Sequence, residues 1–163
     1  MYCVVTIFVN SYSKKSYSTE EHVMKCRQIE QQAFEYHKSG FHCAEAVAKA
    51  VIEAYSDESN PAVPKIASAF GGGIGGTNED LCGALAGGLI AIGYVYGRMA
   101  PGEDWQQAKN LAAELRKQFI TQYGATNCPQ VLETLGPQEN GMKCKQLSGI
   151  VAGLVTRLFQ ENG

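Results

Sequence analysis

The feature that most constrains the fold is a concentration of glycine in the middle of the chain. Ten of the 18 glycines lie between Gly71 and Gly97, first as the run 71–76 and then inside an uncharged segment from Leu81 to Gly97. This segment has seventeen residues, and a helix needs about 20 apolar residues to span a bilayer. We therefore expect a helix buried in the core, where glycine lets neighbouring backbones approach closely.

Helical signals dominate the chain after residue 17. Apolar residues recur at steps of three and four, and capping residues, glycines and prolines separate the periodic segments. The predicted helices cover residues 18–39, 43–56, 65–70, 81–97 and 103–123, then a short helix from 128 and a last one over 143–160. Only residues 2–9 resemble a strand. The sequence thus predicts an all-α, single-domain bundle of about five to seven helices, with a short N-terminal strand or arm.

Three local details follow from the same patterns. The segment from Thr77 to Asp80 has good capping chemistry, so the glycine-rich helix should open near Leu81. Trp105 is expected in the core stripe of the helix that follows it. One face of the glycine-rich helix should carry Cys82, Leu85, Ala86, Leu89, Ile90 and Gly93.

Composition excludes several classes of function. The chain has 163 residues, of which 45% are apolar and 18% charged, and its net charge is −2. No segment gathers the basic residues that nucleic acid or an anionic membrane would attract. Six cysteines are too few for a secreted disulfide scaffold and follow no secretory leader. We therefore expect a reduced, cytoplasmic setting, with neither nucleic acid nor a membrane as partner.

Four of the six cysteines share one local position. Cys43, Cys82, Cys128 and Cys144 each fall at, or within the first turn of, a predicted helix. A helix N-terminus presents unpaired N–H groups and positive partial charge, which stabilise a thiolate, lower the cysteine pKa and donate to cluster sulfurs. This placement favours redox chemistry or metal ligation.

The alternative is that each cysteine is a small buried hydrophobe. That explanation suits Cys3, in the apolar N-terminal stretch, and Cys26, in the middle of a helix. The other four have no reason to favour helix starts as core residues. No Cys-x-x-Cys occurs, which argues against zinc ribbons and thioredoxin-type motifs. Any shared site must therefore be assembled by tertiary folding.

The glycine run could also serve such a site. Gly71, Gly73 and Gly76 formally match a dinucleotide fingerprint, but neither a strand nor a βαβ unit surrounds them, so no nucleotide is expected. Bare backbone amides could instead approach a cluster or an anionic ligand. The candidate cofactor-binding glycines are Gly71, Gly72, Gly73, Gly75 and Gly83.

Three histidines complete the candidate residues. His22, His37 and His42 lack the spacing of a metal site. Only His42, next to Cys43, is kept as a group that could support the cysteines or transfer a proton. No Ser-His-Asp or paired-carboxylate arrangement is visible, so hydrolase chemistry has no support.

These motifs together resemble the C_GCAxxG_C_C family of redox-active proteins. The resemblance rests on residues 41–47, 69–75 and 82–87, followed by Cys128-Pro129 and Cys144, and covers roughly residues 25–159. The element C-G-A-x-x-G is complete from Cys82 to Gly87. It implies that the family's four cysteines are Cys43, Cys82, Cys128 and Cys144. Residues 1–23 would be an N-terminal extension, and residues 24–163 the redox domain.

The resemblance leaves the reaction open. The family is similar to the non-haem part of split-Soret cytochromes c, which implies an iron–sulfur centre, but no C-x-x-C-H motif for covalent haem occurs. The cysteines would hold an iron–sulfur cluster or another metal for electron transfer or sensing. Otherwise they would form two disulfide pairs of a thiol oxidoreductase, or a structural Cys₄ zinc site. A redox partner of unidentified kind is expected, and a homodimer stays open.

Overall fold

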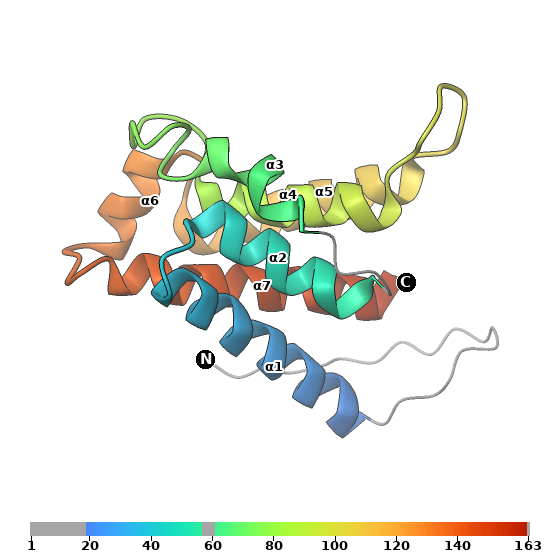
Figure 1. Cartoon of the computed structure of the whole chain (residues 1–163), viewed down its shortest axis with the longest axis horizontal. Coiled ribbons are helices and arrows are strands. Elements are labelled where there is room, and N and C mark those ends of the chain that lie inside the picture. The colour runs from blue at the N-terminus through green and yellow to red at the C-terminus, as the bar shows by residue number, and fades with distance from the viewer. Residues whose placement is uncertain (1–18, 57–60, 163) are drawn as a thin grey trace.

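The computed structural model describes residues 19–56 and 61–162. Within them the chain forms seven α-helices and one short 3₁₀ helix, which confirms the all-α bundle (Figure 1). The predicted strand over 2–9, Cys3 and the first residue of the helix predicted over 18–39 lie outside the described residues. The elements are α1 (Thr19–Lys38), α2 (Cys43–Tyr55), α3 (Val63–Ala67), η1 (Ser68–Phe70), α4 (Gly83–Tyr96), α5 (Gln106–Tyr123), α6 (Cys128–Leu135) and α7 (Met142–Asn162).

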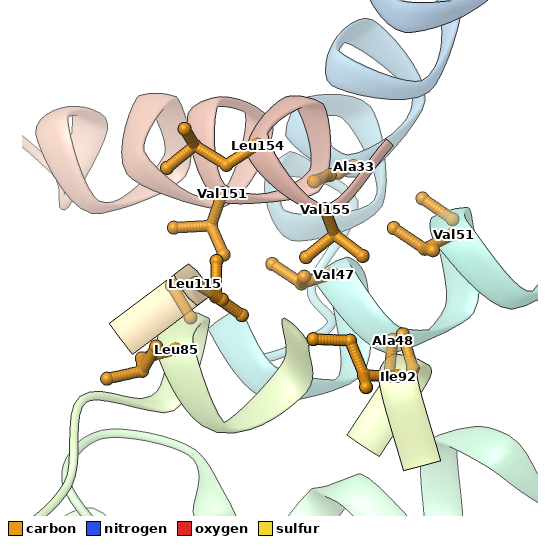
Figure 2. Close-up of a cluster of buried hydrophobic side chains, with 14 of the residues drawn as sticks. Ala33, Val47, Ala48, Val51, Leu85, Ile92, Leu115, Val151, Leu154 and Val155 are labelled. Atoms are coloured by element: carbon orange, nitrogen blue, oxygen red, sulfur yellow. The ribbon is translucent and has the colours of Figure 1, made fainter. Parts of the chain in front are cut away.

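The core lies between α2, α4 and α7, with α1 and α5 packed on its outer sides. Val47 and Val51 of α2 meet Val151 and Val155 of α7 there, with Leu85 and Ile92 of α4 and Leu115 of α5 beside them (Figure 2). Burying one such side chain stabilises the fold by about 1.5–3 kcal/mol. The core thus fixes α2, α4 and α7 relative to one another. Three of the four candidate cysteines lie at the starts of these helices.

The glycine-rich helix α4 is buried around most of its first half. Its eight buried residues include Gly87 and Gly88, whereas Leu89 and Ile90 are partly exposed and Gly93 is exposed. The buried residues of α4 therefore surround most of the helix instead of following only the predicted face, because α4 packs between α2, α5 and α7. A Cβ on Gly87 would lie 2.5 Å from the carbonyl oxygen of Ala44, so glycine permits this contact with α2. Among the described residues, no helix has the length and apolarity needed to cross a membrane.

The first helix packs against the last. A Cβ on Gly149 would lie 2.8 Å from the carbonyl oxygen of Glu30, and Arg157 pairs with Glu30 at 3.4 Å. Cys26 is fully buried at this crossing, as expected for a core cysteine. Helix α1 is continuous from Thr19 to Lys38, so the proposed boundary between residues 23 and 24 falls inside it.

Two helix starts differ from the sequence prediction. Helix α4 begins at Gly83 with Cys82 as its N-cap, rather than near Leu81, because the preceding residues pair with another segment. Trp105 is the N-cap of α5 and is 51% exposed, so it is not a core residue. Periodicity assigned it to the stripe of α5, but its backbone is not yet helical.

Candidate functional site

The four candidate cysteines all lie at helix starts. Cys43 is the first residue of α2, Cys82 the N-cap of α4, Cys128 the first residue of α6, and Cys144 the third residue of α7. Figure 1 shows the beginnings of α2 and α7 at the left end of the molecule, beside α6. All four cysteines line one cavity of about 130 Å³ there. The cavity is completed by His37, His42, Gly72, Asn78, Gly83, Ala84, Val131, Leu132 and Leu147.

One short backbone pairing positions two of these cysteines. Leu81 and Asn127 form an isolated antiparallel bridge. On one side the N–H of Cys82 donates to the carbonyl of Thr126 at 2.8 Å, and on the other the N–H of Cys128 donates to the carbonyl of Asp80 at 2.6 Å. The segments before α4 and α6 are thus tied together immediately before both helices begin.

The glycine run forms a left-handed turn beside the cavity. Residues 72–76 all have positive φ, between +58° and +76°, including Ile74 at +62°. Glycine adopts this conformation at little cost, whereas other residues are strained in it. Gly72 lines the cavity, and a Cβ on Gly73 would lie 2.7 Å from the Cβ of Cys128. The run therefore packs directly against the cysteine cavity.

Two further glycines allow close approach at the other cysteines. A Cβ on Gly83 would overlap the Sγ of Cys43 and would lie 2.7 Å from the carbonyl oxygen of Phe70. A Cβ on Gly71 would lie 2.8 Å from the Cβ of His42. By contrast, nothing lies within 4 Å of the equivalent position at Gly75. Of the five candidate glycines, Gly75 alone is therefore not packed at the site.

A buried carboxylate ties the glycine run to the start of α2. Glu45 is 9% exposed and accepts a hydrogen bond from the N–H of His42 at 2.6 Å. It also accepts a hydrogen bond from the hydroxyl of Ser68 in η1, which immediately precedes the glycines. Glu45 is a site residue that was not predicted from the sequence, although its position three residues after the N-cap is typical of a capping box.

The thiols of Cys82, Cys128 and Cys144 have raised pKa values, the opposite of the lowering that helix starts predict. Backbone N–H groups of Leu85 and Ala84 lower the pKa of Cys82, but burial outweighs them and raises it to about 12. Burial likewise raises the pKa of Cys144 to about 11 and that of Cys128 above its usual value. Negative charge at Cys43 raises the pKa of all three further. The expectation was wrong because it left out the desolvation of a thiolate in the cavity.

His37 is a cavity residue that the sequence analysis set aside. Burial, with smaller effects of positive charge at Lys145 and His42, lowers the pKa of His37 to about 4, so its ring is neutral at pH 7. The hydroxyl of Ser148 donates to the carbonyl of Cys144 at 3.2 Å. Nδ1 of His37 lies 2.8 Å from the hydroxyl oxygen of Ser148, and the ring is also hydrogen-bonded to the backbone of Cys144.

The sequence around His37 does not indicate that it belongs to the cysteine site, because His37 is in α1 and none of the four cysteines is in that helix. His42 lines the cavity as expected, as the N-cap of α2. His22 lies at the other end of α1, where its carbonyl accepts a hydrogen bond from Gln160 at 3.0 Å.

The four cysteines line one cavity, but they do not form a compact site for a single metal ion. Within residues 19–56 and 61–162, no three His, Cys, Asp or Glu side chains are arranged so that they could hold a metal ion. The side chain of Asn78 approaches the ring of thiols, with Oδ1 at 3.8 Å from the Sγ of Cys128. The site is therefore a small, mostly apolar chamber lined by four thiols.

Comparison with known proteins agrees with this arrangement of motifs. A family model described as "Putative redox-active protein (C_GCAxxG_C_C)" matches residues 41–158, a range that contains Cys43, Cys82, Cys128 and Cys144. No curated protein and no solved structure matches the chain. The match covers well over half of the 163 residues and confirms the resemblance found in the sequence. The chain belongs to the C_GCAxxG_C_C family of redox-active proteins.

Proposed function

We propose that Cys43, Cys82, Cys128 and Cys144 form a single redox site that holds an iron–sulfur cluster for electron transfer or sensing. The observation that carries this proposal is that all four thiols line the same cavity although they come from four different helices. Such a cluster, when bound, supplies one-electron chemistry. The protein's residues would bind it, exclude water from it and set its electrostatic surroundings.

The donor set fits a cluster. Iron–sulfur clusters are commonly held by four cysteine thiolates. Their ligands are distributed over several iron atoms, so they lie further apart than the ligands of a single ion. The wider spacing of cluster ligands agrees with four thiols that line a cavity. It also agrees with the finding that no three donors among the described residues are arranged for one metal ion. A single structural zinc ion has correspondingly less support.

The backbone around the cavity also suits a cluster. The N–H groups of Ala84 and Leu85 point at the Sγ of Cys82, where they lower its pKa. Gly72 and Gly83 bring bare backbone to the cavity wall. Hydrogen bonds from backbone N–H groups to cluster and ligand sulfurs stabilise negative charge and tune reduction potentials.

The raised thiol pKa values support metal binding over free thiol exchange. Reactive cysteines of thiol oxidoreductases have lowered pKa values, because the thiolate is the nucleophile. Here the pKa is about 12 at Cys82 and about 11 at Cys144. A coordinated metal ion deprotonates a thiol outright, so the same cysteines become thiolates on binding.

A second function, metal-free thiol/disulfide chemistry, also has an observation in its favour. Charge at Cys43 acts on the three other thiols, and charge at Cys128 acts on Cys82 and Cys144, so the four thiols are close enough to interact electrostatically. Two thiols would lose two protons and two electrons to an external acceptor and form one disulfide. Among the described residues, no three His, Cys, Asp or Glu side chains are arranged to hold a metal ion, which is consistent with this alternative.

Anaerobic purification followed by redox titration separates the two functions. A cluster predicts a coloured protein, one-electron titration and an electron paramagnetic resonance signal in one of its oxidation states. Dithiol chemistry predicts a colourless protein with a two-electron titration that Cys82→Ser alters. A colourless protein in which neither titration is detected would contradict both functions. Cys26→Ala is the matched control, because Cys26 is buried between α1 and α7, outside the cavity.

A further inference from the structure

A second cavity, of about 280 Å³, lies between α4 and α5. Its lining differs from that of the cysteine cavity and includes no thiol, histidine or carboxylate. Three leucines, Leu81, Leu85 and Leu89, form one wall at intervals of four residues. The opposite wall carries Ala112, Ala113 and Arg116 of α5. We call this cavity the α4–α5 groove.

The shape of the groove follows from the residue sizes on its two walls. Leu85 and Leu89 lie about one turn apart on the same face of α4, and Leu81, in the bridge before the helix, lines the same wall. Ala112 and Ala113 lie opposite the leucines, and their short side chains leave the groove open at this part of the contact between the two helices. An aliphatic chain is the chemical group that such a channel would desolvate favourably.

The charge at the groove comes from one residue. Arg116 is exposed and is the single charged side chain in the lining. Within the described residues it forms no ion pair, whereas its neighbour Lys117 pairs with Glu114 at 3.4 Å. A guanidinium group presents two parallel N–H donors that match the two oxygens of a carboxylate. The groove thus combines an apolar channel with an unpaired cation at its edge.

We propose that the α4–α5 groove binds a short-chain aliphatic carboxylate. The aliphatic chain lies against the three leucines, and the carboxylate pairs with the guanidinium of Arg116. This site is separate from the cysteine cavity, so it stands whether or not a cluster binds there. Leu81 and Thr126, which also line the groove, belong to the two segments that the Leu81–Asn127 bridge joins.

Titration of the full chain with hexanoate tests the proposal, with amide chemical shifts as the readout. Hexanol lacks the carboxylate and acetate lacks the chain, so each should bind about tenfold more weakly than hexanoate or worse. The shifts should be largest at the groove residues. Equal binding of hexanol and hexanoate, or shifts spread over the surface without saturation, would overturn the proposal.

Three variants locate the site. Arg116→Gln should weaken hexanoate binding about tenfold, while Lys117→Gln, a matched loss of charge on the same helix, should leave it unchanged. Ala113→Leu should block the channel; Ala113 is exposed, so the substitution is compatible with folding. If Arg116→Gln and Lys117→Gln weaken hexanoate binding equally, hexanoate is attracted to the positive charge of α5 in general and not to the groove. Unchanged hexanoate binding in Ala113→Leu would also overturn the proposal.

Discussion

The N–H of Cys128 donates a 2.6 Å hydrogen bond to the carbonyl of Asp80, two residues before Cys82. This bond and its counterpart from Cys82 to Thr126 hold the starts of α4 and α6 side by side. Two cysteines that are 46 positions apart in the sequence are therefore brought together by one backbone bridge, and both side chains are buried. Changes in the backbone here should affect the site more than changes in the surrounding apolar residues.

Gly83→Ala tests the close approach at Cys43. The new Cβ would overlap the Sγ of Cys43 and crowd the carbonyl of Phe70, so we expect a loss of at least about 2 kcal/mol in the free energy of unfolding. Gly93→Ala in the same helix is the control, because nothing lies within 4 Å of its Cβ position. It should gain up to about 1 kcal/mol from helix propensity. Denaturant unfolding measures both, and equal effects would contradict the packing at Gly83.

Gly73→Ala and Gly75→Ala separate backbone strain from contact with a cysteine. Both glycines have positive φ, +68° and +63°, so each substitution should cost about 1 kcal/mol in strain. Only Gly73→Ala also meets the Cβ of Cys128, at 2.7 Å, and it should therefore cost at least about 1 kcal/mol more. Thermal or denaturant unfolding of the pair gives the difference. If the two variants lose the same stability, the glycine run does not support Cys128.

His37 should make the fold sensitive to mild acid. Its folded-state pKa of about 4 lies below the ordinary value of 6.5, so the unfolded chain takes up the proton first as the pH falls. Stability is fully present above pH 6.5 and falls between pH 6.5 and 4, by about 2 kcal/mol after allowance for partial exposure. His37→Gln keeps a side chain that can hydrogen-bond to Ser148 but cannot be protonated. The unfolding free energy of this variant should fall less between pH 6.5 and 4 than that of the unaltered chain. If the unfolding free energies of the two proteins fall in parallel, His37 is not buried as a neutral ring.

The thiol of Cys144 should alkylate with an unusual pH dependence in protein freed of metal. Its pKa is about 11, so the thiolate fraction grows about tenfold per pH unit up to pH 10. An ordinary thiol approaches its maximal rate near pH 9. Site-resolved mass spectrometry after brief iodoacetamide treatment at each pH measures the rate. A rate that levels off between pH 8 and 9 would contradict the burial of Cys144.

The helices and the cysteine positions could be predicted because they depend on local sequence. Periodic apolar residues and breakers such as Gly124, which ends α5 at φ +77°, act within a few residues. The prediction failed where tertiary contacts decide. The bridge at Leu81 moved the start of α4 to Gly83, and Trp105 lies just before α5 begins.

The same distinction explains what was missed at the site. Cys144 and His37 are on different helices, and only the crossing of α1 and α7 brings them to one cavity. Desolvation of Cys82 also depends on everything packed around it, so local helix-start electrostatics gave the wrong direction for its pKa. A single sequence carries no signal for either effect.

The iron and acid-labile sulfide content of anaerobically purified protein is the decisive measurement for the cysteine cavity. A four-cysteine cluster site predicts iron and sulfide together in the unaltered chain and in the control Cys26→Ala. It predicts loss of most of both in each single variant Cys43→Ser, Cys82→Ser, Cys128→Ser and Cys144→Ser, since all four thiols line one cavity. Unaltered protein that contains no iron, or any one of the four variants with its full iron and sulfide content, would contradict a four-cysteine cluster site.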